Sequence, residues 1–235
     1  MKRIVMKNSI LLGCLVIAFS FNSGYLFADV QGSTDNNADI EIMDGGLGGV
    51  PASASTITIT ENAIIEDVTF SIEGLSHTFA GDLVAIVSHV ESGRSATLFS
   101  RIGRTSTAFN DDGDESNFDG NYDFSDATLN DIWAEAASGP TNFVIRNTDD
   151  PTQQNPGVYR ASAGLTGGFI SLNEAFGGFT TAGTWRLELT DRNATQVGTF
   201  REFGVRFTAA VPEPSTIVLI MAMGIGAVGI RRRRC

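Results

Sequence analysis

Short runs in which apolar and polar residues alternate dominate the middle of this 235-residue chain. Because successive side chains of a β-strand point to opposite faces, such a run forms a strand with one buried face. Turn-forming pairs such as Ser92-Gly93 separate the runs. We expect antiparallel strands at residues 56–59, 68–72, 83–87, 96–102, 185–189 and 203–207.

So many short strands, each with one apolar face, need a second sheet to cover them. The sequence therefore predicts an all-β fold, a two-sheet antiparallel β-sandwich over residues 56–210. One helix is expected at residues 125–137, with Asp126 near its start and Leu129 and Trp133 at helical spacing. Residues 29–55 are rich in Asp, Asn, Gly and Ser, which predicts a flexible leader before the sandwich.

Residues 211–235 carry three signals in a fixed order. Pro212, Glu213 and Pro214 come first, an uncharged apolar run follows at 215–230, and a basic end closes the chain with Arg231, Arg232, Arg233 and Arg234. As a helix the apolar run spans roughly 24 Å, somewhat less than the roughly 30 Å hydrocarbon core of a bilayer. The arginines favour the cytoplasmic side, so the preceding domain is expected outside the cytoplasm.

This tail resembles the PEP-CTERM sorting signal of Gram-negative bacteria that make extracellular polysaccharide. The resemblance implies that an exosortase-type enzyme recognises the motif at the inner membrane. A transmembrane helix at 215–230 then anchors the chain until the tail is processed and the product is released or attached at the cell surface, outer envelope or matrix.

The N-terminus agrees with export. Lys2, Arg3 and Lys7 form a positive segment, an apolar segment follows at 10–21, and Ala28 precedes the expected cut. Residues 1–28 are therefore predicted to be a signal peptide. Both cysteines of the chain, Cys14 and Cys235, lie in segments expected to be removed, so no disulfide is predicted in the mature domain.

The net charge becomes more negative when the two chain ends are left out. All 27 acidic residues lie between Asp29 and Glu213, with nine arginines and no lysine among them, so the net charge of this part is about −18. Nucleic acid and anionic membrane surfaces need a basic face and are excluded as partners. The negative charge can instead serve to bind divalent cations, to bind basic partners, or to keep the protein soluble.

Several segments of the expected sandwich resemble the P domain, or Homo B domain, that follows the catalytic domain in proprotein convertases. They are residues 77–83 (HTFAGDL), 117–119 (NFD), 157–160 (GVYR), 182–191 (AGTWRLELTD) and 197–200 (VGTF). The resemblance covers residues 57–208 and implies a jelly-roll-like sandwich. A P domain carries no catalytic groups, and we expect no enzymatic activity from this chain.

Two functions follow from these resemblances. The first is a structural or adhesive protein of the cell surface or matrix, with extracellular polysaccharide as a partner. The alternative is an accessory or regulatory module that binds a separate secreted subtilisin-like protease. His77 and His89 are the only histidines available for a catalytic triad, and no Gly-x-Ser-x-Gly or His-Glu-x-x-His motif is present.

An acidic stretch at residues 110–126 contains the candidate metal ligands. Carboxylates at this density suit Ca²⁺, although their spacing does not fit an EF-hand loop. The expected ligands are Asp111, Asp112, Asp114, Asp119, Asp123 and Asp126, completed by Asp82 across the fold. A solvated acidic loop is the other interpretation, and the sequence leaves both open.

A second constellation is aromatic. Phe169 and Phe179 follow glycine pairs, and Phe176 and Trp185 lie near them. Exposed rings could stack on sugars, whereas buried ones would fill the core of the sandwich. The sequence does not decide between these two roles.

Overall fold

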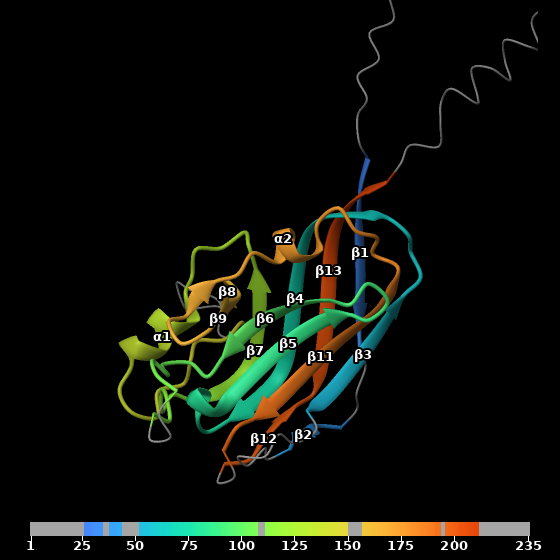
Figure 1. The fold of residues 1–235 in the computed structure, drawn as a ribbon. Coiled ribbons are helices and arrows are strands. Elements are labelled where there is room, and N and C mark those ends of the chain that lie inside the picture. The colour runs from blue at the N-terminus through green and yellow to red at the C-terminus, as the bar shows by residue number, and fades with distance from the viewer. Residues whose placement is uncertain are drawn as a thin grey trace, which may run out of the picture.

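Two sheets, antiparallel except for one parallel strand pair, enclose the core (Figure 1). The computed structural model describes residues 26–34, 38–43, 52–107, 111–149, 157–193 and 196–211. The larger, seven-stranded sheet has the order β1–β13–β4–β12–β2, with β7 beside β4 and β8 beside β7. Its strands are β1 (Leu26–Ser33), β2 (Ile40–Ile42), β4 (Ile64–His77), β7 (Phe118–Ser125), β8 (Val158–Tyr159), β12 (Gly198–Phe200) and β13 (Glu202–Val211).

The smaller sheet has four strands in the order β3–β11–β5–β6. They are β3 (Ser53–Ile59), β5 (Leu83–His89), β6 (Arg94–Ser100) and β11 (Gly183–Asp191). A separate two-stranded hairpin joins β9 (Ser162–Ala163) to β10 (Gly168–Phe169). The predicted all-β sandwich is confirmed, and each of the six runs of alternating residues lies in or overlaps an observed strand.

Large aromatic side chains fill the space between the sheets. Phe70 of β4 and Phe203 of β13 stack with ring centroids 6.2 Å apart, and Trp185 of β11 packs 5.8 Å from Phe70 across the core. All three side chains are buried, and the indole N–H of Trp185 donates to the Thr181 carbonyl at 3.0 Å. Burial of these rings is the main stabilising contribution, because each removes a large apolar area from water.

The prediction of a flexible leader at 29–55 is wrong where the structure describes it. Strand β1 pairs along its length with β13, β2 pairs with β12, and β3 begins at Ser53. The sandwich thus runs from residue 26 to 211 rather than from 56 to 210. Strand β1 also begins inside the predicted signal peptide, so a cut after Ala28 would remove its first three residues.

The predicted helix at 125–137 is shorter and starts later. Helix α1 (Ile132–Ser138) begins after Asp131, whose side chain accepts from the Trp133 backbone N–H. Residues up to Ser125 belong to β7 instead. A second helix that the sequence did not indicate, α2 (Leu172–Phe176), and a 3₁₀ turn, η2 (Ala80–Asp82), complete the fold.

The expectations for the chain ends fall outside the described residues. These are most of the signal peptide at 1–28, the Pro-Glu-Pro triplet, the transmembrane helix at 215–230 and the arginine block. Within the described part of the chain, no helix combines the length and apolar character that crossing a membrane requires.

Candidate ligand-binding groove

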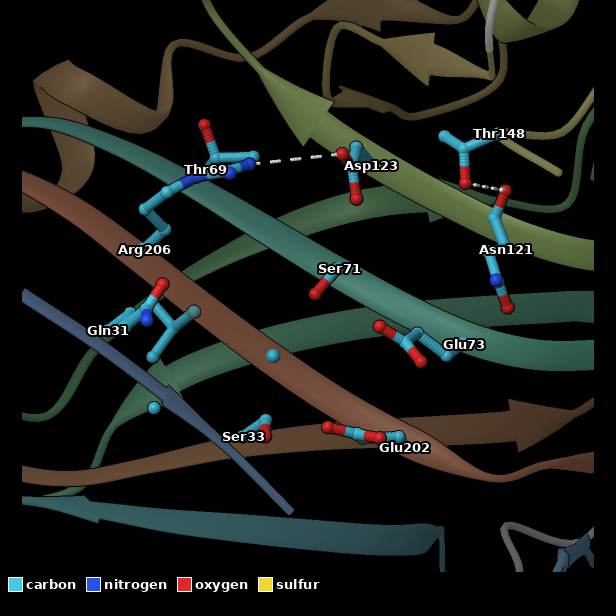
Figure 2. Close-up of a pocket in the computed structure, with 13 residues that line it drawn as sticks. Gln31, Ser33, Thr69, Ser71, Glu73, Asn121, Asp123, Thr148, Glu202 and Arg206 are labelled. Atoms are coloured by element: carbon cyan, nitrogen blue, oxygen red, sulfur yellow. Dashed lines mark hydrogen bonds and ion pairs between the residues drawn. The ribbon is translucent and has the colours of Figure 1, made fainter. Parts of the chain in front are cut away.

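A polar groove of about 550 Å³ lies on the face of the seven-stranded sheet that points away from the core (Figure 2). Its lining comes from β1, β13, β4 and β7, together with Thr148. These strands alternate, so that Phe70 and Phe203 point into the core while their neighbours face the groove. The lining residues are Gln31, Gly32, Ser33, Thr69, Ser71, Glu73, Asn121, Asp123, Thr148, Glu202, Gly204, Val205 and Arg206.

Strand register places small residues in a row across the floor of the groove. Ser33 of β1 lies opposite Gly204 of β13, Gly204 lies opposite Ser71 of β4, and Ser71 lies opposite Asp123 of β7. A side chain at position 204 would point outward and collide with the Ser71 hydroxyl. The absence of a side chain on Gly204, a buried residue, therefore leaves room for the Ser71 hydroxyl on the floor of the groove.

One wall of the groove is fixed by hydrogen bonds between β7 and the loop that carries Thr148. The Asn121 carbonyl accepts from the Thr148 backbone N–H at 2.8 Å, and the Asn121 side-chain amide donates to Asp149 at 2.6 Å. The Asn121 side-chain oxygen also accepts from the Gly74 N–H at 2.7 Å. Gly74 has a φ of +62°, a conformation that favours glycine, at a register shift in β4.

The charges in the groove are mostly negative. Glu73 and Glu202 lie directly opposite each other on β4 and β13. At the other end, Arg206 Nη2 lies 4.0 Å from Asp123 Oδ2, and Figure 2 shows Ser71 between these two groups of charges. Three carboxylates line the groove with Arg206, and Arg201 Nη2 lies 4.0 Å from Glu73 Oε2 beside it, so negative charges outnumber positive ones and disfavour anionic ligands.

Two of these carboxyl groups have perturbed acidity. Partial burial raises the pKa of Glu73, the negative charge of Glu202 raises it further, and Arg201 works against both. Burial also raises the pKa of Asp123, an effect that Arg206 opposes. The groove thus offers hydroxyl, amide and carboxylate oxygens, which can pair with the hydroxyl groups of a hydrogen-bonding ligand.

The predicted calcium ligands lie at several separate places. Asp111 accepts from the Ser106 N–H at 2.6 Å, and Asp114 accepts from the Ser116 N–H at 2.8 Å, so each closes its own loop. Asp126 accepts from Ser171 Oγ and from the first two backbone N–H groups of α2. Asp119 and Asp112 are exposed and Asp123 lines the groove. In the described ranges, no three His, Cys, Asp or Glu residues form a group that could hold a metal ion.

Asp82 belongs to a different, fully buried polar cluster. The ring of His77 lies between Asp191 Oδ2, 3.0 Å from Nε2, and the Phe79 carbonyl, 2.9 Å from Nδ1. Burial and the charge of Asp191 raise the pKa of Asp82 to about 6, while His77 lowers it. Arg101 Nη2 lies 3.9 Å from Asp82 Oδ1. Because His77, Asp82 and Asp191 are buried, this cluster is not open to a substrate.

The four aromatic residues that the sequence singled out divide between core packing and surface exposure. Trp185 and Phe176 are core residues, with centroids 5.1 Å apart. Phe169 and Phe179 are exposed, and each lies against an arginine: Arg160 for Phe169 and Arg94 for Phe179. Only these last two rings are accessible for a contact with another molecule.

Sequence reasoning missed most of the groove. Asp123 was singled out as a metal ligand, whereas Ser71, Gly204 and Glu202 were not singled out at all. The available signal was the outward positions of the strands around residues 70 and 204, which hold small polar residues and glycine. The register that brings those positions together is not visible in the sequence.

Known proteins resemble the C-terminal tail and the β-sandwich in separate comparisons. Residues 210–234 match the family model described as the PEP-CTERM protein-sorting motif. This match confirms the predicted sorting signal. It indicates that the β-sandwich protein is exported and carries a C-terminal, membrane-anchored sorting signal. A comparison with curated proteins found no match.

Two solved structures are similar to the body of the chain. One is the serine protease of Aeromonas sobria in complex with the chaperone ORF2, with 17% identity and a TM-score of 0.43. The other is the serine protease of Aeromonas sobria, with 19% identity and a TM-score of 0.41. In both cases the match covers 80% of this chain and 28% of the solved chain, so the chain spans less than a third of those proteins.

Proposed function

We propose that this protein is a non-catalytic component of the cell surface or extracellular matrix whose groove holds a strand of uncharged polysaccharide. The observation that carries the proposal is the open row Ser33–Gly204–Ser71 across the paired strands of the groove floor. A hydroxyl-rich chain can lie along this floor and exchange hydrogen bonds with the surrounding side chains. The carboxylates beside the row disfavour an anionic chain.

The environment of the two histidines supports a non-catalytic role. Both ring nitrogens of His77 already have partners inside the core. The ring of His89 packs 4.8 Å from that of Trp185, and its nitrogens lie 2.9 Å from Ser92 Oγ and 3.1 Å from the Ala182 carbonyl. A general base must reach the proton that it abstracts, and neither ring is placed to meet a substrate.

A steric block tests the groove directly. In the variant Gly204→Val, combined with Ser71→Ala to make room, the new side chain occupies the floor of the groove. We expect it to abolish retardation in gels that contain dextran, pullulan or xylan. Thr208→Val is the matched control, because Thr208 is exposed on the same strand but does not line the groove.

Equal retardation of the blocked variant and the control would contradict binding in the groove. Because the double variant could disturb the sheet, Arg206→Ala serves as a second test with an exposed side chain. The release of reducing ends from any of these polysaccharides would contradict the non-catalytic role. Co-purification with a subtilisin-like protease from the culture medium would favour the accessory role instead.

A further inference from the structure

The hairpin β9–β10 lies outside both main sheets, with β9 packed against β6 and with its turn and β10 on the surface. Its two strands pair through only two residues each, Ala163 with Gly168 and Ser162 with Phe169. Phe169 is 50% exposed, and a side chain at Gly164 would meet nothing within 4 Å. The turn and β10, which have few buried contacts, therefore open at low cost in free energy.

Two potential ligand-binding side chains lie beneath this hairpin. The Gly167 backbone sits directly on the indole of Trp133, since a Cβ at position 167 would lie 2.6 Å from Trp133 Cδ2 and Cγ. The guanidinium carbon of Arg160 lies 4.9 Å from the centre of the Phe169 ring. The hairpin thus covers Trp133 with its turn and Arg160 with its second strand.

Strand β9 and the two side chains beneath the hairpin have buried hydrogen-bonding groups without a partner among the described residues. Trp133 Nε1, Arg160 Nε and Ser162 Oγ are buried and have no hydrogen-bond partner in the described part of the chain. The Ser162 residue is only 3% exposed. Buried donors without a partner are rare and destabilising, so three of them at one hairpin, two beneath it and one on β9, require an explanation.

We propose that the turn and second strand of the hairpin are a movable cover over a subsite for a carboxylated sugar residue. A carboxylate is an acceptor with two oxygens, which matches two N–H donors and a hydroxyl. Its bond to a guanidinium is among the stronger hydrogen bonds in proteins. The exposed ring of Phe169 offers an apolar face for the sugar ring. This subsite is separate from the groove and goes beyond the proposed function, because it selects an acidic sugar.

The chain contains a matched control for the aromatic contact. Arg94 lies 3.7 Å from the centre of the Phe179 ring, so the two residues form the same type of pair. Here, however, Arg94 Nη1 already donates to the Ala175 carbonyl at 2.7 Å. Phe179→Ala should therefore remove an exposed arginine-stacked ring without affecting the subsite.

The test is a titration of the full-length protein carrying the groove block, Gly204→Val with Ser71→Ala, kept in mild detergent, with tetragalacturonate and with uncharged maltotetraose. Binding is measured by calorimetry and by the change in tryptophan fluorescence. We expect tetragalacturonate alone to bind, Trp133→Phe and Phe169→Ala each to weaken it at least about tenfold, and Phe179→Ala to leave it unchanged. Trp133→Phe keeps an aromatic ring in place and removes the five-membered ring that carries the indole N–H.

Three results would overturn the proposal: no binding of tetragalacturonate by the folded protein, equal binding of maltotetraose, or unchanged affinity in both Trp133→Phe and Phe169→Ala. A groove blocked by Gly204→Val should leave this binding intact. Failure of the groove and failure of the hairpin subsite are therefore distinguishable.

Discussion

Replacing the buried carboxylate Asp82 by asparagine should make the protein more stable at neutral pH. Asp82 is fully buried, and burial together with Asp191 raises its pKa from 3.8 to about 6. Since the pKa is higher in the folded than in the unfolded state, the folded protein holds the proton more tightly. Ionisation of Asp82 therefore lowers stability as the pH rises from about 4 to about 6.

The size of this effect follows from the shift in pKa. A difference of about two pH units corresponds to roughly 3 kcal/mol of lost stability once Asp82 is ionised. An asparagine side chain at this position would resemble the protonated acid in shape and charge. We expect Asp82→Asn to raise the free energy of unfolding by about 1–3 kcal/mol at pH 7.5, with the gain shrinking toward zero near pH 4.

Urea unfolding at several pH values between 4 and 7.5, in the presence of a chelator, measures this gain. Asp119→Asn is the control, because Asp119 is an exposed carboxylate on β7, and the stability of this variant should follow that of the parent protein. A variant that loses stability by the same amount at every pH would refute the reasoning. It would mean that the charge of Asp82 is fully compensated in the folded state, for example by Arg101.

Three further predictions concern the core, a helix cap and the metal. Phe203→Ala should lower the free energy of unfolding by about 3–5 kcal/mol, because the ring is buried against Phe70; a loss under about 1 kcal/mol in urea would contradict this packing. Asp126→Ala should cost about 1–2 kcal/mol, since Asp126 accepts three hydrogen bonds at the start of α2, and an unchanged unfolding midpoint would argue against that cap. Because the predicted Ca²⁺ ligands lie apart in the described residues, adding Ca²⁺ should give the same melting temperature as adding chelator; a rise of several degrees with Ca²⁺ would contradict this and point to a calcium site.

The sequence predicted the strands best where apolar residues occupy every inward position, as in β4 and β13. It missed β1 because one inward position is Gly32, where a Cβ would collide with Ile57 and Ile59 of β3. The glycine allows β1 to approach the smaller sheet closely, and it also erases the alternating pattern. Strand β7 was hidden for another reason, since the aspartates around Tyr122 gave its sequence the composition of a loop.

Features that depend on tertiary contacts were beyond local sequence patterns. Asp126 was expected near the start of a helix at 125–137, yet it caps α2, which lies 46 residues further along. The groove joins residues near 32, 71, 123 and 204, and only the pairing register of four strands brings them together. Neither arrangement follows from composition or spacing, because both are set by how the sheet assembles.

The central claim is that a strand-built body is exported and then processed at its tail. Mass spectrometry of the protein recovered from culture supernatant and from membranes tests this claim most directly. We predict a mature mass that lacks residues 1–28 and the C-terminal sorting segment. Recovery of the intact, uncut chain from the cytosol would contradict it.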